Sequence, residues 1–197
     1  MPSAMDGIPF ISKYIMKKNR KNKKTPAQLA QQKRFALAVS FLRPLKEIID
    51  EGFRFVAKRK KRFVYPFNLA MSQVLKVAIS DQAGVPSLDP QKAWLSDGNL
   101  PGLLVLDVTI EGSRIRVSYT SFASFCAWDD HVRLIAYQVK EGVAIRSQSL
   151  ALRSEKQVSL DIPESLIGKE LLLYILCNER DGLKYARSQY LGTYQIN

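Results

Sequence analysis

The sequence predicts an α+β protein in which an N-terminal helical segment precedes an antiparallel β-sandwich of the immunoglobulin or fibronectin III-like kind. Three observations lead to this prediction. Apolar residues recur at three- and four-residue spacings over residues 29–56, which is the period of a helix. Beyond residue 103 the apolar period becomes two, which is the period of a strand. Between them, "DQAGVPSLDP" at 81–90 is rich in turn-forming residues and predicts a linker.

The helical segment has a well-defined predicted start. In Thr25-Pro26-Ala27-Gln28, the threonine can cap the helix, the glutamine can bond back to the cap, and proline suits the first helical position. Pro44 lies inside the apolar pattern and predicts a kink or a division of the helix. A second helix is expected over residues 67–79. The apolar face of the first helix is formed by Leu29, Phe35, Ala38, Leu42, Leu45, Ile49, Phe53 and Val56.

The strand pattern begins with a hairpin. Leu104, Leu106, Val108 and Ile110 alternate with other residues, Glu111-Gly112-Ser113 forms a turn, and the alternation then resumes. About seven short strands without intervening helices are typical of a β-sandwich. The further strands are expected at 132–139, 145–152, 158–162, 171–177 and 187–196.

These elements divide the chain into four parts. They are a basic tail at 1–24, a helical segment at 25–80, a linker at 81–90 and a β-sandwich at 91–197. The apolar face of the helices has to be covered, either by the sandwich or by a second copy of the chain. Self-association is therefore one expectation.

Composition and charge restrict the classes of partner. The 197 residues are 46% apolar and 10% aromatic, as in globular proteins, and the net charge is +12. Residues 1–62 hold 17 Lys and Arg against 4 Asp and Glu, whereas residues 63–197 hold 13 against 14. The positive charge thus belongs to the N-terminal third, and such asymmetry indicates an anionic partner.

Three segments also resemble a known family. "TPAQLAQQKRFALAVSFLRPL", "FNLAMSQVLKVAI" and "WLSDGNLPG" occur here in the order and spacing of domain of unknown function 6266, a family common in Bacteroidota. The resemblance implies a basic N-terminus, a helical segment and a C-terminal β-sandwich, and it implies no activity. The family's usual Gly- and Lys-containing segment upstream is represented here only by Asp6-Gly7-Ile8-Pro9.

Two basic clusters are the candidate contacts for a nucleic acid or another polyanion. Neutralising phosphates would give affinity through counterion release, and lysines before a helix N-terminus favour a bound anion. The alternative is a solvated tail and a solubilising helix end, because the clusters contain no interleaved aromatic residues and match no base-reading motif. The clusters are Lys17, Lys18, Arg20, Lys21, Lys23, Lys24, Lys58, Arg59, Lys60, Lys61 and Arg62.

Asp129-Asp130-His131 is the one candidate for chemistry. It could form a metal site or an acid–base pair, but neighbours in a strand point to opposite faces, and no further His or Cys pair supplies ligands. A loop leading into a strand is the favoured interpretation. The motifs of nucleotide-binding loops and nucleophile elbows are absent from the sequence. We therefore expect no catalytic residues, no metal and no cofactor.

The remaining candidates are aromatic or sulfur-containing. Trp94 and Trp128 are expected in the core, with an exposed ligand-binding pair as the alternative. Cys126 and Cys177 are interpreted as buried thiols, although they could pair in an oxidising compartment. Three tyrosines near the C-terminus, Tyr185, Tyr190 and Tyr194, are expected in a strand whose edge could accept a partner strand.

The sequence therefore favours a non-enzymatic binding or structural protein that assembles with itself or with another protein. The alternative is a nucleic-acid-associated protein that uses the basic clusters. An enzyme centred on Asp129 to His131 is the least favoured class. No secretory signal and no membrane-length apolar run is recognised, which predicts a cytoplasmic protein without a membrane partner.

Overall fold

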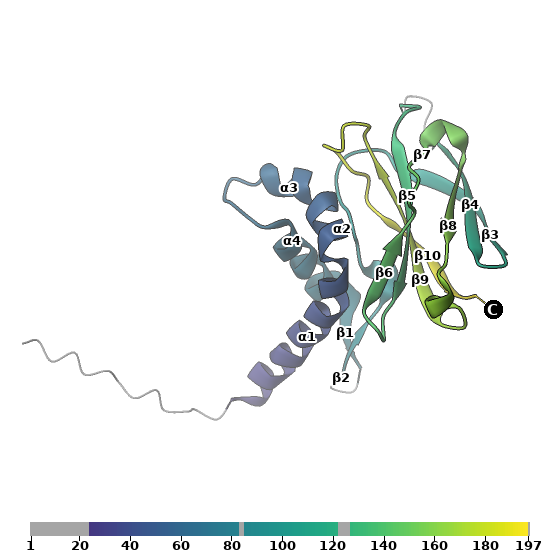
Figure 1. The fold of residues 1–197 in the computed structure, drawn as a ribbon. Coiled ribbons are helices and arrows are strands. Elements are labelled where there is room, and N and C mark those ends of the chain that lie inside the picture. The colour runs from purple at the N-terminus through teal and green to yellow at the C-terminus, as the bar shows by residue number, and fades with distance from the viewer. Residues whose placement is uncertain (1–23, 83–84, 122–126, 197) are drawn as a thin grey trace, which may run out of the picture.

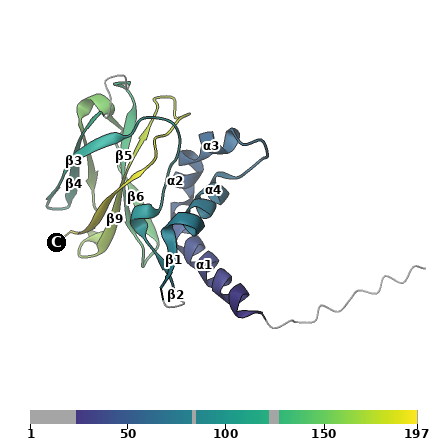
Figure 2. The same cartoon turned by 180° about the vertical axis from the view of Figure 1, so that it is seen from behind.

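The computed structural model describes residues 24–82, 85–121 and 127–196. Figure 1 shows helices on one side of two β-sheets, and Figure 2 shows the same arrangement from behind. The protein is thus of the α+β class, with a helical N-terminal part and antiparallel sheets, as predicted. The helical elements before the first strand are α1 (Pro26–Leu42), η1 (Arg43–Leu45), α2 (Lys46–Gly52), α3 (Arg54–Lys58), α4 (Pro66–Gln73) and the π-helix η2 (Val74–Ala78).

The predicted helix start is confirmed. The Thr25 side chain accepts a hydrogen bond from the Gln28 backbone N–H at 3.2 Å, and the Gln28 side chain accepts one from the Thr25 N–H at 3.0 Å. Pro26 occupies the first turn. The predicted division at Pro44 is also confirmed, because the 3₁₀ turn η1 separates α1 from α2 there.

The structure has a hairpin where the sequence predicts a linker. β1 (Ile79–Gln82) and β2 (Val85–Leu88) pair antiparallel, with Ile79 opposite Leu88. The turn-forming residues of 81–90 therefore belong to a hairpin that packs on the helices. β2 contacts α1, and Leu88 packs against the hydrophobic cluster that contains the buried residues of the helices. The 3₁₀ turn η3 (Pro90–Lys92) follows.

In the part of the chain that the structure describes, eight strands form the two larger sheets. In one sheet the order is β10-β9-β5-β6, with β7 also pairing with β5, and in the other it is β3-β4-β8. The predicted strand at 145–152 is two strands, because its residues pair with different parts of β5. The strands are β3 (Leu103–Glu111), β4 (Arg114–Ser121), β5 (His131–Gln138), β6 (Val143–Arg146), β7 (Ala151–Leu152), β8 (Gln157–Asp161), β9 (Glu170–Asn178) and β10 (Gln189–Gln195). The short turns η4 (Arg153–Glu155) and η5 (Glu164–Leu166) flank β8.

Two hydrophobic clusters hold the layers together. One lies between the two sheets and contains Val117 of β4, Leu134 of β5 and Leu173 of β9. The other joins the helices to the opposite face of the β5–β9 sheet and contains Leu45 and Tyr174. Successive residues of β9 alternate between the clusters, so this strand is covered on both faces. The helical segment and the sheets therefore share a core.

The alternation predicted for 104–110 changes face part-way along β3. A β-bulge between Val105 and Asp107 adds a residue to this strand relative to β4. As a result Leu104 and Leu106 are exposed, whereas Leu103 is buried and Val105 and Val108 pack on the cluster between the sheets. The expectation of one continuous apolar face is wrong for this strand.

Candidate functional site

The basic cluster after α3 is an exposed turn. Lys58, Arg59, Lys60, Lys61 and Arg62 are all exposed, and none forms an ion pair with an acidic side chain in the described part of the chain. Their positive charge is thus available to a partner.

Aromatic residues from the flanking sequence gather at this turn. The Arg59 guanidinium lies 5.5 Å from the centre of the Phe55 ring. The Phe63 ring, whose residue is 83% exposed, meets the Tyr65 ring edge to face at 4.8 Å. The sequence shows no aromatics inside the run itself, but the turn brings those on either side of it next to the charges.

The N-terminal basic cluster falls almost entirely outside the described residues. Lys17, Lys18, Arg20, Lys21 and Lys23 belong to the part that the structure does not describe. Lys24 is described, and its Nζ donates to the Gln32 side chain at 2.9 Å across the first turns of α1.

The first half of α1 projects beyond the sheets (Figure 1). Its apolar residues Leu29 and Phe35 are 45% and 53% exposed, while burial begins at Ala38. The sheets and the other helices therefore cover this face only in the second half of the helix, because the helix is longer than the surface on which it packs.

Phe35 joins two hollows on this face. One, of about 530 Å³, lies between α1 and α4 and includes Phe67, Met71 and Leu75 in its lining. The other, of about 560 Å³, lies along α1 between Lys24 and Ala36. We call the combined surface the α1/α4 groove. It is lined by Lys24, Gln28, Gln31, Gln32, Arg34, Phe35, Ala36, Phe67, Asn68, Met71, Ser72, Leu75 and Lys76.

The charge of the α1/α4 groove is entirely positive. Lys24, Arg34 and Lys76 contribute cations, and no carboxylate lines either hollow. The Arg34 guanidinium pairs with Asp81 of β1 at 3.2 Å and donates to the carbonyl of Leu75 in η2 at 3.1 Å, so it connects α1 to both elements. Lys76 forms no ion pair with a described residue, so it remains available to a partner.

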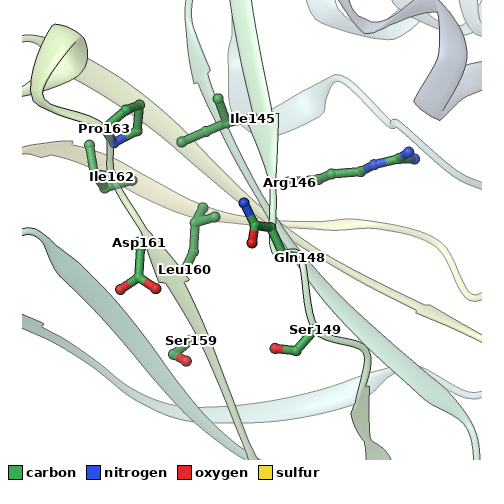
Figure 3. Close-up of a pocket in the computed structure, with 9 residues that line it drawn as sticks. All are labelled: Ile145, Arg146, Gln148, Ser149, Ser159, Leu160, Asp161, Ile162 and Pro163. Atoms are coloured by element: carbon green, nitrogen blue, oxygen red, sulfur yellow. The ribbon is translucent and has the colours of Figure 1, made fainter.

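A third hollow lies between β6 and β8 (Figure 3). Its volume is about 570 Å³, and we call it the β6/β8 groove. Leu160, Ile162 and Ile145 form its apolar part, while Ser159 and Ser149 face each other across it (Figure 3). The remaining lining residues are Arg146, Gln148, Asp161 and Pro163.

The structure separates the side chains of the Asp-Asp-His segment. Asp130 is buried and pairs with Arg153 at 2.9 Å, whereas Asp129 meets the exposed Arg180 at 3.5 Å. Burial raises the pKa of the Asp130 carboxyl, and the Arg153 charge opposes that rise in part. Within the described ranges, no group of three His, Cys, Asp or Glu side chains is arranged to hold a metal ion.

The tryptophans do not form a pair. Trp94 is half-buried against the cluster beneath the helices, and the Arg187 guanidinium stacks 3.6 Å from its ring centre. Trp128 is 68% exposed in the turn before β5. The core interpretation thus applies to Trp94, and an exposed ligand-binding pair does not form.

The sulfur and tyrosine candidates have packing roles where they are described. Cys177 is buried in β9 and its sulfur accepts a hydrogen bond from Arg153 at 3.1 Å, while Cys126 lies outside the described residues. Tyr185 is buried, and Tyr190 packs against Tyr174 with ring centres 5.3 Å apart. The Tyr194 hydroxyl donates to the Leu191 carbonyl.

Comparison with known proteins identifies the family. The model of a family of unknown function, DUF6266, matches residues 1–192. The chain belongs to this family. The match confirms the resemblance recognised in three sequence segments, and it covers nearly the whole chain. No curated protein sequence matches this DUF6266 chain.

Solved structures with a likeness to this DUF6266 protein include one weak match. It is the chicken interferon gamma receptor alpha chain, with 12% sequence identity and a TM-score of 0.36. The match covers 60% of this chain and 63% of the receptor chain.

In the described ranges, no helix is long and apolar enough to cross a membrane.

Proposed function

We propose that this DUF6266 protein is a non-enzymatic docking protein whose α1/α4 groove binds an acidic, amphipathic helix of a partner protein. The observation that supports this proposal is the placement of Phe35: it is half exposed, and it joins two hollows whose linings include Lys24 and Lys76 and no carboxylate. A partner helix would place apolar side chains on Phe35 and Met71 and carboxylates near Lys24 and Lys76.

The chemistry of the groove suits a helix. Apolar side chains at three- and four-residue spacings on one face of a helix fit a groove between two other helices. Burying an exposed aromatic ring contributes roughly 25 cal/mol per Å² of apolar surface removed from water. Aromatic residues at the centre of an interface commonly dominate its affinity, which makes Phe35 the expected anchor.

We further propose that the strands form a β-sandwich of the immunoglobulin or fibronectin III-like kind that supports the helical layer. The strand orders β3-β4-β8 and β6-β5-β9-β10, with one hydrophobic cluster between them, support this assignment. In this proposal the sandwich is a rigid base, and the helices bound to its outer face carry the docking surface.

The test is binding of a designed peptide by fluorescence anisotropy. The probe is a fluorescein-labelled helical peptide with Leu or Phe at positions i, i+4 and i+7 and glutamates at the other exposed positions. We expect micromolar binding that Phe35→Ser weakens at least tenfold and that Lys76→Glu also weakens. Leu183→Ser is the matched control, because Leu183 is similarly exposed (54%) on a distant loop and should leave the affinity unchanged.

The probe also defines what would reject the proposal. Equal affinity for wild type and Phe35→Ser would exclude the α1/α4 groove as the docking site. A version of the peptide with lysines in place of glutamates should bind at least tenfold more weakly at ~50 mM salt, where charges are least screened. Equal binding of the two peptides would reject the acidic partner.

The turn at 58–62 supports a second candidate function, binding of a nucleic acid. Its cations are exposed and form no ion pair with another described residue, and Phe63 and Tyr65 lie beside them as surfaces for base stacking. Titration with mixed-sequence single-stranded DNA at several salt concentrations should give a log–log slope of about −0.7 per phosphate engaged. Replacing residues 58–62 with serines should flatten that slope, and no binding at ~50 mM salt would exclude this candidate.

A further inference from the structure

β8 has an open edge that faces the β6/β8 groove. Backbone hydrogen bonds alternate along an antiparallel strand, so every second residue directs its N–H and C=O away from the paired neighbour. Ile162 donates its N–H to the Ser113 carbonyl at 2.8 Å, and Tyr119 donates to the Lys156 carbonyl at 2.9 Å. The even-numbered residues of β8 therefore bond to β4.

Ser159 and Asp161 consequently point their backbone groups toward the groove. No backbone hydrogen bond joins either residue to another described residue on that side. On the opposite wall, Ser147 donates its N–H to Leu134 at 2.9 Å, which places the backbone groups of Arg146 at the open edge of β6. The groove thus lies between two open strand edges.

The bottom of the groove belongs to the core between the sheets. Leu160 and Ile162 are nearly fully buried members of that cluster, and Ile145 packs against it. An added strand would therefore bond along β8 through its backbone and place every second side chain over these three residues. This combination of an open edge and an apolar base is that of a strand-addition site.

We propose that β8 binds residues 8–15 of a second copy of this chain as an added strand. The segment is Ile8-Pro9-Phe10-Ile11-Ser12-Lys13-Tyr14-Ile15, in which β-branched and aromatic residues predominate. Its one proline stands near the beginning, where strands tolerate it. With Phe10 and Tyr14 turned toward the apolar base, Lys13 turns toward solvent.

The geometry favours a second copy over the same chain. Figures 1 and 2 both show the N-terminal end of α1 directed away from the sheets, and β8 belongs to the sheet on the far side from the helices. Residues 17–24 can span roughly 26 Å when extended, enough to separate a docked strand from the helix that follows it. A neighbouring molecule is therefore the better acceptor.

The N-terminal segment is basic, whereas residues 63–197 are nearly neutral. Residues 1–24 carry 7 Lys and Arg and 1 Asp, whereas residues 63–197 carry a net charge of −1. At the groove, Asp161 is exposed and pairs with Arg114, Arg146 lines the opposite wall, and Glu164 is exposed and close to Asp161 in sequence. Because donor and acceptor surfaces differ, two molecules can exchange their segments in a closed two-fold dimer, or successive molecules can pass them on in rings or open chains.

The test uses the full chain with two readouts, light-scattering mass against concentration and hydrogen exchange of the β8 amides. We expect the mass to rise with concentration while exchange at Ser159 and Asp161 slows at least tenfold. Ser159→Pro removes one outward-facing N–H without removing a hydrogen bond to β4, and it should keep the protein monomeric. Ser159→Thr is its control, because it keeps the N–H and should assemble like the wild type.

Two further variants complete the test and separate it from the proposed function. Phe10→Asp with Tyr14→Asp alters the donor and leaves every described residue unchanged, and it should also abolish assembly. A synthetic peptide of residues 7–16 should then protect the β8 amides of this variant. Phe35→Ser should assemble normally, so loss of peptide docking in the α1/α4 groove and loss of assembly are independent results.

Three outcomes would overturn the proposal. The first is a monomer at all concentrations whose β8 amides the peptide does not protect. The second is an oligomer that survives both Ser159→Pro and the donor variant. The third is protection of β8 that is independent of concentration and lost in the donor variant, which would show that the strand comes from the same chain.

Discussion

Among the described residues, the buried side chain of Arg153 donates hydrogen bonds to partners in several different elements. Its guanidinium pairs with Asp130 at 2.9 Å and donates to the carbonyls of Gly102 at 3.0 Å and Pro101 at 2.8 Å. It also donates to the Cys177 sulfur. One buried side chain thus connects the approach to β3, the start of β5, the turn η4 and strand β9.

Replacing this arginine should destabilise the protein more than breaking any of its exposed ion pairs. Arg153→Met leaves the Asp130 carboxyl buried without its cation, and breaking a buried pair in this way costs about 3–5 kcal/mol. Urea unfolding followed by circular dichroism measures the loss. Adding Asp130→Asn removes the isolated charge, so the double variant should be more stable than Arg153→Met alone. An unchanged urea midpoint in Arg153→Met would contradict the role given to this pair.

The buried tyrosines predict a loss of stability at high pH. Burial raises the pKa of Tyr137 to about 12 from its ordinary 10.0, and burial also raises the pKa of Tyr119 and Tyr174. Because the unfolded chain releases these protons first, their contribution is intact below pH 10.0 and is lost as the pH rises toward about 12.

Phenolate absorbance and circular dichroism should therefore change together above pH 10.0 as the protein unfolds. Tyr137→Phe should reduce the slope of stability against pH in this range, although it also removes the hydrogen bond to the Phe41 carbonyl. Titration of all tyrosines near their ordinary pKa without unfolding would show that the hydroxyls are accessible to solvent.

Gly52 allows the end of α2 to lie very close to the backbone of residues 95–97. It lies at the end of α2, and a Cβ built on it would lie 2.5 Å from the Leu95 carbonyl oxygen and 2.6 Å from Ser96 Cβ. Its own carbonyl accepts a hydrogen bond from the Asp97 N–H at 3.2 Å. The helix therefore approaches the segment before β3 more closely than any side chain permits.

Gly52→Ala should accordingly destabilise the protein, although alanine favours helices. Helix propensity alone would give a gain of about 1 kcal/mol. The clash requires α2 to move from the 95–97 segment, and overpacking of this kind costs about 1–3 kcal/mol. Glu47→Ala, on the exposed side of the same helix, is the control and should change the urea midpoint little. A more stable Gly52→Ala variant would mean that α2 and the 95–97 segment can move apart at little cost in free energy.

At the scale of the whole molecule, the helices and sheets should unfold together. β5 and β9 give alternate side chains to the two hydrophobic clusters, so neither cluster can be lost without exposing one face of the same sheet. We expect the far-UV circular dichroism of the whole chain and the fluorescence of Trp94 to report one coincident transition in urea.

Leu45→Ala provides the matched perturbation, because Leu45 is buried beneath the helices and belongs only to their cluster. It should lower the free energy of unfolding by about 2–5 kcal/mol, and by the same amount whether circular dichroism or fluorescence is followed. Trp128→Phe makes Trp94 the sole fluorescent tryptophan for this measurement. Separate transitions, with the helical signal lost first, would mean that the helical layer is an independent unit.

The local features of the fold follow from the sequence alone. The Thr25 cap, the division at Pro44 and the hairpin between β3 and β4 depend on neighbouring residues, and the structure confirms them. The uninterrupted apolar run at 171–177 carried a further signal: a strand without alternation is covered on both faces, which points to the helical layer on the outer face of this sheet.

Only the tertiary structure decided which apolar residues remain uncovered. Leu29 and Phe35 have the same spacing as the buried positions of α1, and their exposure depends on where the supporting surface ends. The faces of β3 depend on a bulge, and the open edge of β8 depends on which strands pair. Such properties arise from contacts between residues that are distant in sequence, whereas periodicity and capping depend only on near neighbours. The sequence alone therefore predicted most helices and strands, and the tertiary structure determined the candidate sites.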